Sequence, residues 1–284
     1  MIAHDSCAAQ VKAWQGRMEH ALSVRLPAAD EVPTRLHAAM RYSVLSGGQR
    51  VRPLLLFGAA RALGLDETQV EAAACAIEFA HAYSRVHDDL PAIDDDDLRH
   101  GRPSCHRAYD EGTAVLVGDA LQSLAFQLLA SDAALPAAPG VRLRLIGLLA
   151  EAIGASGLAG GQAIDVATQG ERVSLAEIDA MHGRRTVALM RASVLMAAAC
   201  APRVAPPLHE ALAAFAAALA LALQIQQELL DGAADARYSA ALGPAASRER
   251  VRRLHAEALE ALQPLGPAAD PLRGLAQWLL APGD

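Results

Sequence analysis

The sequence predicts an all-α fold, built as one bundle of helices. Long stretches of the chain are rich in Ala, Leu, Glu and Arg, which are good helix formers. Short breaks with Gly and Pro separate these stretches, and few segments alternate between apolar and polar residues as strands do. No linker and no repeat of fixed period interrupts the chain, so we expect residues 1–284 to form a single domain.

The helix-forming stretches follow one another along the chain, and the breaks between them set the expected boundaries. We expect helices over residues 6–25, 31–46, 51–63, 67–90, 104–108, 112–131, 138–157, 174–181, 185–201, 206–231, 246–263 and 270–280. A bundle of this kind builds its internal site from side chains on facing helices.

Local signals mark where some of these helices begin and end. Asp66 stands just before an expected helix, where its carboxylate can accept hydrogen bonds from free backbone N–H groups. The segment Ser174–Glu177 has the spacing of a capping box. Pro91 should end its helix just after Asp89, which leaves residues 94–97 on a turn.

The composition predicts a large core and argues against partners that need a basic surface. Hydrophobic residues make up 53% of the chain and charged residues 20%, which suits a packed core and argues against disorder. The formal net charge of -7 argues against nucleic acid or an anionic membrane as partner. Lys12 is the only lysine among the 25 Lys and Arg residues, so arginine is the cation of this chain.

Cysteine usage and hydropathy predict a cytoplasmic protein without a membrane span. The four cysteines are Cys7, Cys75, Cys105 and Cys200. They form no CxxC pair and fit reduced thiols better than a disulfide or zinc framework. Residues 1–14 carry charges and lack the apolar segment of a secretory signal. The longest apolar run, residues 211–223, is shorter than the roughly 18–20 residues that cross a bilayer.

An acidic run from Asp88 to Asp97 is the most informative feature of the chain. It places six carboxylates within ten residues, and these charges repel one another unless water or a cation compensates them. A solvated acidic loop is one interpretation. The other is a Mg²⁺ site, because Mg²⁺ prefers oxygen ligands and completes its shell with water and substrate phosphates. Arg99 and Arg102 favour the metal site for a phosphorylated substrate, since guanidinium groups match phosphate oxygens.

Further polar segments lie at the ends or on the faces of expected helices. Residues 45–53 place Arg50 and Arg52 at a Gly-rich helix start, which favours anion binding. His81 lies about two helical turns before Asp88. The remaining segments are Gly118–Gln122, Gly160–Asp165, Arg185–Thr186 and Gln224–Asp231.

In this order and spacing, the segments resemble those of the trans-isoprenyl diphosphate synthase family, specifically its bacterial farnesyl diphosphate synthase (geranyltranstransferase) group. The resemblance covers about residues 42–231, most of the chain. Its most specific part is the stretch from Asp88 to Leu98, which has the DDxxxxD spacing typical of the group.

The resemblance implies the isoprenoid synthase fold, in which antiparallel helices surround a deep central cavity, and a homodimer in the cytoplasm. It also implies a reaction that depends on Mg²⁺, or on Mn²⁺ as an alternative ion. The substrates would be isopentenyl diphosphate and an allylic diphosphate, either dimethylallyl or geranyl diphosphate. Metal ions offset the charge that grows on the departing diphosphate, and a dry apolar cavity keeps water from the allylic cation.

The resemblance also assigns roles to individual residues. The set expected at the metal and the allylic diphosphate is Asp88, Asp89, Asp94, Arg99, Arg185, Thr186 and Gln224. Asp88, Asp89 and Asp94 are the expected metal ligands, and Glu228 and Asp231 are expected to bind the metal only weakly. The set expected at isopentenyl diphosphate is Gly48, Gln49, Arg52, His81 and His100. The bulky floor that limits chain length corresponds to Tyr83 and Ser84, which implies C10 or C15 products. Arg185 replaces a family lysine, which we attribute to the loss of lysine throughout the chain.

Some of these polar and aromatic residues also have a purely structural interpretation. Tyr83 and Phe79 could be core residues. Gln162 and Asp165 could be helix-capping groups. Arg85 stands where we expect an apolar residue beside the cavity, and the sequence gives no physical account of it.

The chain departs from the family where charge matters. The second aspartate-rich motif, DDxxD in the family, reads Gln227-Glu228-Leu229-Leu230-Asp231, and Mg²⁺ tolerates little error in its octahedral geometry. Gln49 replaces the lysine of the GGKR motif, and His100 replaces an arginine with a side chain that is mostly neutral at pH 7. The loop over residues 232–243 is shorter than in the family by roughly 15–20 residues. Asp235 falls near one of its lysines, and Arg237 is a candidate substitute.

Three hypotheses follow for the function. The first is a short-chain (C10/C15) trans-prenyl diphosphate synthase with impaired condensation. The second is a weak or inactive partner subunit that forms a heterodimer with an active synthase. The third is an enzyme that uses only the allylic subsite, as a lyase or a diphosphatase. Each missing phosphate contact weakens binding by about 1.5–3 kcal/mol, so three or four losses would remove most of the condensation activity.

Overall fold

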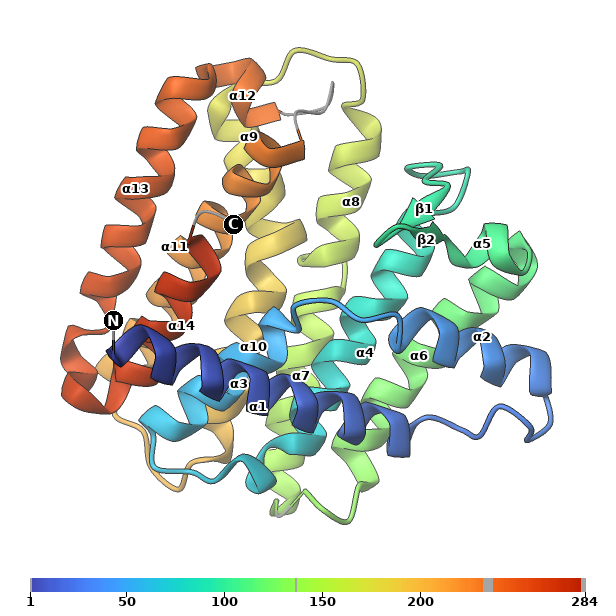
Figure 1. The fold of residues 1–284 in the computed structure, drawn as a ribbon, viewed down its shortest axis with the longest axis horizontal. Helices are drawn as coiled ribbons and strands as arrows, with labels where there is room; N and C mark the ends of the chain where they lie inside the picture. The colour runs from blue at the N-terminus through green and yellow to red at the C-terminus, as the bar shows by residue number, and fades with distance from the viewer. Residues whose placement is uncertain (1, 136, 232–236, 282–284) are drawn as a thin grey trace.

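The computed structural model describes residues 2–135, 137–231 and 237–281, with side chains from Cys7 onward and without that of Asp231. The described chain is an all-α bundle, as the sequence predicts (Figure 1). The helices of its first half are α1 (Ile2–Arg25), α2 (Thr34–Val44), α3 (Val51–Ala62), α4 (Glu71–Asp88), α5 (Cys105–Ala108), α6 (Glu111–Ser131) and α7 (Pro139–Ile153).

The second half continues the bundle with seven further helices. They are α8 (Leu158–Ala167), α9 (Leu175–His182), α10 (Ala188–Cys200), α11 (Pro206–Asp231), α12 (Arg237–Leu242), α13 (Pro244–Ala261) and α14 (Asp270–Leu280). Short 3-10 segments, η1 (Glu67–Gln69) and η3 (Gln263–Ala269), and a π-helical turn, η2 (Gly183–Val187), join some of them.

Apolar faces of neighbouring helices form the core. α4 packs along α6, α11 packs along α13, and α10 contacts α3, α7 and α11. In Figure 1, α10 lies near the middle of the bundle, while α1 crosses in front of α3. Phe57, Phe79, Leu121 and Leu219 are completely buried, so each contributes its full apolar area to stability.

The predicted helix boundaries are confirmed where the sequence carries a capping signal. Asp66 accepts a 2.9 Å hydrogen bond from the backbone N–H of Thr68, and the Gln69 side chain accepts one from Asp66 in return. Ser174–Glu177 forms the expected capping box. α4 ends at Asp88, and the acidic residues that follow lie outside any helix.

The structure corrects the prediction in the region of α8 and α12, which the sequence left without helices. Gly160 and Gly161 lower the helix propensity of α8. Close packing explains them, because a Cβ atom on Gly161 would lie 2.4 Å from the backbone nitrogen of Arg185. The helix expected over residues 67–90 also begins one segment later, after the 3-10 turn η1.

A small hairpin forms between α4 and α5. Among the described residues, the only strands are β1 (Leu98–Arg99) and β2 (Arg102–Pro103), which pair antiparallel. Figure 1 places the hairpin at the edge of the bundle, beyond the end of α4 and next to α5. Gly101, with φ of +73°, and His100, with φ of +50°, make the tight turn between the two strands.

No uninterrupted apolar run of this chain reaches the length of a membrane span, but helix length and overall composition give a different result. By length and composition alone, three segments qualify: Glu111–Ser131, Pro139–Ala167 and Pro206–Leu230. Buried residues make up 39%, 33% and 44% of their most apolar windows. Their hydropathy includes side chains that fill the core, such as Leu121 and Leu145, which the count of uninterrupted apolar residues did not weigh.

Candidate functional site

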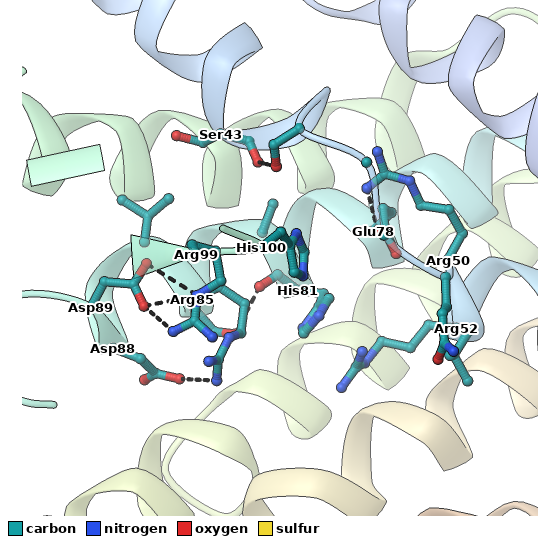
Figure 2. A pocket seen from close by; sticks show the side chains of 18 of the residues that line it. Ser43, Arg50, Arg52, Glu78, His81, Arg85, Asp88, Asp89, Arg99 and His100 are labelled. Carbon is teal, nitrogen blue, oxygen red and sulfur yellow. Dashed lines mark hydrogen bonds and ion pairs between the residues drawn. The ribbon is translucent and has the colours of Figure 1, made fainter. Parts of the chain in front are cut away.

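A cavity of about 700 Å³ brings together residues from distant parts of the chain. It lies at the end of α4, between the turn before α3, the β1–β2 hairpin, η2 and α11. Figure 2 shows the sides from which Arg52, His81, Asp88 and Arg99 enter it. The predicted site residues that line it are Gly48, Gln49, Arg52, His81, Ser84, Asp88, Asp89, Arg99, His100, Arg185, Thr186 and Gln224. A second cavity of about 1120 Å³ contains Asp94 and Glu228 in its wall and shares Arg185 and Gln224 with the first.

Two carboxylates of the acidic run meet one arginine. The Arg185 Nη2 atom lies 3.6 Å from Asp88 Oδ2 and 3.2 Å from Asp94 Oδ2. Burial raises the pKa of both carboxyl groups, and the arginine charges oppose this rise. Arg185 and Thr186 belong to the π-helical turn η2, a distortion that is frequent at functional sites. Thr186 donates a 3.2 Å hydrogen bond to Gln224 Oε1.

The third carboxylate, Asp89, is held by Arg99. The Arg99 guanidinium on β1 bonds to Asp89 through Nη2 and through Nε at 3.1 Å, and reaches Asp96 at 2.9 Å. Figure 2 shows Arg99 and Arg85 together between the carboxylates and His81. The short hairpin therefore positions Arg99 at the end of α4.

In the part of the chain that the structure describes, no three His, Cys, Asp or Glu side chains converge as metal ligands would. Arginine side chains contact these carboxylates instead: Asp88 pairs with Arg85 and Arg185, and Asp94 pairs with Arg185. The donors still fit Mg²⁺: they are carboxylate oxygens, and two of them converge on a single cationic nitrogen.

The opposite side of the cavity carries the residues expected at isopentenyl diphosphate. Arg52 Nε is buried without a hydrogen-bond partner, and burial lowers the pKa of Arg52 to about 10, so it stays charged at pH 7. Burial and Arg52 hold the pKa of His81 well below its usual value, so His81 is neutral at pH 7. Burial and Arg99 also lower the pKa of His100. With Gln49 uncharged, Arg52 supplies the only full charge of this predicted set.

Arg50, which also belongs to the Gly-rich turn, is used by the fold. Its φ of 55° is left-handed, and its buried guanidinium bonds to Glu19 at 2.7 Å, Glu78 at 2.8 Å and the Val44 carbonyl at 2.7 Å. These bonds hold the turn that presents Gly48 and Gln49 to the cavity. A Cβ atom on Gly48 would lie only 3.4 Å from His100 Cε1, so the turn and the hairpin are close.

Only half of the predicted chain-length floor lines the cavity. Ser84 is part of the cavity wall and donates a 2.8 Å hydrogen bond to the His81 carbonyl. Tyr83 is 6% exposed and packs edge-on against His87, with ring centroids 5.9 Å apart. Phe79 is fully buried in the core, as its structural interpretation predicts.

Glu228, a predicted weak metal ligand, is engaged elsewhere. It accepts hydrogen bonds from Gln224 Nε2 at 3.3 Å and from the Tyr238 backbone N–H at 2.9 Å, and it lies 3.5 Å from His182 Nε2. The side chain of Asp231 and all of Asp235 lie outside the described residues.

Arg237, the candidate substitute for a loop lysine, is tied to α8. It pairs with Asp165 Oδ1 at 2.5 Å and donates to Thr168 Oγ1 at 3.0 Å. Asp165 also pairs with Arg185, and Gln162 donates to Asp94 at 3.4 Å. The capping role considered for Gln162 and Asp165 is therefore wrong, because Gln162 donates to Asp94 and the Asp165 side chain pairs with two arginines. The two residues are three positions apart and so share one face of α8, which was the signal available in the sequence.

Comparison with known proteins identifies relatives over nearly the whole chain. The polyprenyl synthetase family model matches residues 33–240. A farnesyl diphosphate synthase of Haemophilus influenzae is 34% identical over 283 residues, covering 94% of this chain and 95% of the relative. A probable farnesyl diphosphate synthase of Bradyrhizobium diazoefficiens is 42% identical over 283 residues, covering 92% of this chain and 83% of the relative. The apo crystal structure of an FPP/GFPP synthase from Zymomonas mobilis is similar with a TM-score of 0.92 and 34% identity, covering 98% of this chain and 100% of that one.

Proposed function

Because this chain belongs to the polyprenyl synthetase family, with the isoprenoid synthase fold and the prenyltransferase activity of its relatives, we propose that it makes C10 or C15 prenyl diphosphates. It would join isopentenyl diphosphate to dimethylallyl or geranyl diphosphate. The observation that carries the proposal is the arrangement of one cavity: Asp88 and Arg99 lie on one side, and Arg52 and His81 on the other. Condensation requires a cavity with two diphosphate subsites, because the new bond forms between the prenyl groups of two bound diphosphates.

Mg²⁺ is the proposed cofactor, with Mn²⁺ as an alternative ion. Asp88 and Asp94 would hold it where they now meet Arg185, and Asp89 would join after release from Arg99. When bound, the ion supplies positive charge that favours departure of the allylic diphosphate. We infer no role for Glu228 as a ligand, since its carboxylate is directed at Tyr238.

The chain's own residues would do the remaining work. Arg99 and Arg185 are placed to donate charged hydrogen bonds to the allylic diphosphate, and bidentate arginine contacts are among the strong ones. Arg52 and the neutral His81 would hold isopentenyl diphosphate. The allylic C–O bond would then break and release diphosphate, the isopentenyl double bond would form the new C–C bond, and the resulting cation would lose one proton to the released diphosphate to give the product. Apolar residues of the cavity wall, including Met190 and Leu223, keep water from the cation.

We propose that condensation is slow at low isopentenyl diphosphate concentration. Gln49 and His100 leave two positions of that subsite without a full charge. Each lost charged contact corresponds to about 1.5–3 kcal/mol, or roughly 10- to 150-fold in affinity. We also propose a cytoplasmic homodimer, as the relationship to bacterial farnesyl diphosphate synthases suggests.

The test is a product assay on the purified protein. It is incubated with Mg²⁺, geranyl diphosphate and labelled isopentenyl diphosphate, and a parallel tube omits the isopentenyl diphosphate. Asp88→Asn and Asp94→Asn are the site variants, and we expect each to lower the rate by about 100-fold or more. Asp97→Asn is the matched control, because Asp97 belongs to the same run but is exposed and pairs with Arg107.

Farnesyl diphosphate formed only in the complete mixture, and lost in the two site variants but not in the control, supports the proposal. Prenyl alcohol or hydrocarbon without isopentenyl diphosphate would instead assign a diphosphatase or lyase. No turnover by the homodimer, with activity restored to an added synthase subunit, would assign a partner subunit.

A further inference from the structure

Arg85 is a cation inside the cavity for which the proposed function has no role. It lies on α4, three residues before Asp88, and its Nη1 atom is 3.2 Å from Asp88 Oδ2. The Arg85 side chain is 32% exposed and Asp88 is 7% exposed, and both line the 700 Å³ cavity. In Figure 2, Arg85 and Arg52 extend into the cavity from opposite sides.

The surroundings of Arg85 contain two other arginines and two carboxylates of the acidic run. Burial lowers the pKa of Arg85, and the nearby charges of Arg99 and Arg185 lower it further. Asp88 and Asp89 act in the opposite direction, and Asp88 is the carboxylate that it contacts. A partly buried cation next to other cations is stabilised by an anion beside it, and Asp88 is that anion for Arg85 when no metal is bound.

Asp88 Oδ2 already has two cationic neighbours. Arg85 lies 3.2 Å away and Arg185 lies 3.6 Å away from this one oxygen. A divalent cation that binds the same carboxylate would weaken both pairs, because like charges repel strongly in a partly buried site. Arg85 would then face the cavity without its partner, next to the positions proposed for the diphosphates.

We propose that Arg85 exchanges partners: it pairs with Asp88 when no metal is bound, and with a substrate diphosphate when a divalent cation occupies Asp88. This inference rests on the proposed function in assigning Asp88 to the metal. The exchange adds one positive charge for the substrate diphosphates in the cavity, where Gln49 and His100 supply none. Arg85 is thus a substrate-binding residue that links metal binding to diphosphate binding.

The exchange has two thermodynamic consequences. Arg85 competes with a metal ion for Asp88 when no diphosphate is present, so it weakens metal binding alone. Once the metal is bound, Arg85 is released and strengthens diphosphate binding. Coupling of this kind is reciprocal, so each ligand must raise the affinity for the other by the same factor.

Binding measurements on the purified full-length protein test both consequences without relying on turnover. Mn²⁺ alone is titrated and followed by electron paramagnetic resonance, and inorganic pyrophosphate is titrated by calorimetry in excess Mg²⁺ and in EDTA. We expect Arg85→Leu to bind Mn²⁺ about threefold or more tightly than the natural protein. We expect it to bind pyrophosphate about tenfold more weakly in Mg²⁺, with a change of less than about threefold in EDTA.

Two further variants complete the design. Arg85→Gln is also neutral and keeps the side chain polar, so it serves if the leucine variant does not fold. Arg107→Leu is the matched control, since Arg107 pairs with Asp97 of the same acidic run but does not line the cavity. It should leave both affinities unchanged.

The exchange is wrong if neutral Arg85 variants bind Mn²⁺ equally well or more weakly. It is also wrong if pyrophosphate affinity falls equally in Mg²⁺ and EDTA, which would make Arg85 a fixed anion ligand. A protein that condenses its substrates but shows either result refutes only the exchange. A protein that shows the two expected shifts without condensation refutes only the proposed function.

Discussion

The carboxylate of Glu228 accepts a 2.9 Å hydrogen bond from the backbone N–H of Tyr238, ten residues further along the chain. This contact joins the end of α11 to the beginning of α12. Tyr238 is fully buried, stacks on His182 at 5.3 Å and donates through its hydroxyl to Asp179 at 2.8 Å. The residue expected to be a weak metal ligand therefore anchors a structural cluster.

Shortening Glu228 should weaken that anchor without creating a metal site. Glu228→Asp removes one methylene, so the carboxylate no longer reaches the Tyr238 N–H. We expect the free energy of unfolding to fall by about 1.5–3 kcal/mol, because a partly buried hydrogen bond to a charged group is lost. Thermal unfolding followed by circular dichroism would show a Tm lower by about 3–8 °C. Glu249→Asp, on the exposed face of α13, is the control; an equal Tm shift there would contradict the assignment.

Gly161 should be intolerant of a side chain, because α8 approaches η2 closely at this point. The Cβ atom of Gly161→Ala would lie 2.4 Å from the Arg185 backbone nitrogen, so α8 or η2 must move. We expect a loss of about 1–3 kcal/mol in the free energy of unfolding. Activity should fall as well, because Arg185 moves relative to Asp94. Denaturant titration and the product assay measure the two effects.

The control for this change is Gly147→Ala. Gly147 lies in α7 with open space at its Cβ position, so alanine should be neutral or stabilising by about 0.5–1 kcal/mol. If both glycine variants lose stability to the same extent, the contact with the Arg185 backbone does not control the result.

Restoring charge at Gln49 and His100 should strengthen isopentenyl diphosphate binding. We expect Gln49→Lys and His100→Arg each to lower the KM for this substrate by about tenfold, since each adds a charged phosphate contact at the cavity wall. The KM for geranyl diphosphate should change much less. Gln127→Lys on the exposed side of α6 is the control for added charge. A fall in both KM values by the same factor would mean general electrostatic attraction.

His81 should make the metal-free protein less stable in mild acid. Burial and Arg52 hold its folded-state pKa well below the unfolded value of about 6.5. Below pH 6.5 the unfolded chain therefore binds a proton that the folded protein does not, so stability falls as the pH drops, by at most about 1.4 kcal/mol per pH unit for one group. His100 acts in the same direction.

Thermal unfolding at pH 7.5, 6.5 and 5.5 checks this pH dependence. His81→Gln should show a smaller loss of Tm between pH 7.5 and 5.5 than the natural protein. His209→Gln, at the beginning of α11, is the matched control for loss of one histidine. An unchanged slope in His81→Gln would assign the acid sensitivity to other groups.

Much of the fold could be predicted from helix propensity and from local signals that begin or end helices. The capping signals at Asp66 and Ser174 and the break at Pro91 act within a few residues, so they operate before any packing is considered. α8 was missed because Gly160 and Gly161 are poor helix formers, and their use is explained only by the neighbouring η2. The hairpin at Leu98–Pro103 was missed because its strands have two residues each.

The sequence predicted which residues line the candidate site better than it predicted which of them form ion pairs with one another. Residue types and spacing indicated the acidic run, Arg99 and the opposing pair Arg52 and His81, and one cavity collects them. The sequence did not indicate that Asp165 would join Arg185, because these residues lie on different helices. Nor did it indicate where the guanidinium of Arg85 would lie.

By itself, the sequence determined the helical class, the chemistry of the donor groups and the family to which they belong, because these depend on local propensity and on residue identity in order. Only the tertiary structure decided which charge faces which. Arg50 became a structural anchor and Arg52 a charge in the cavity, and Glu228 turned to Tyr238. Such choices depend on which partners lie within about 3 Å after packing, a quantity that no single segment contains.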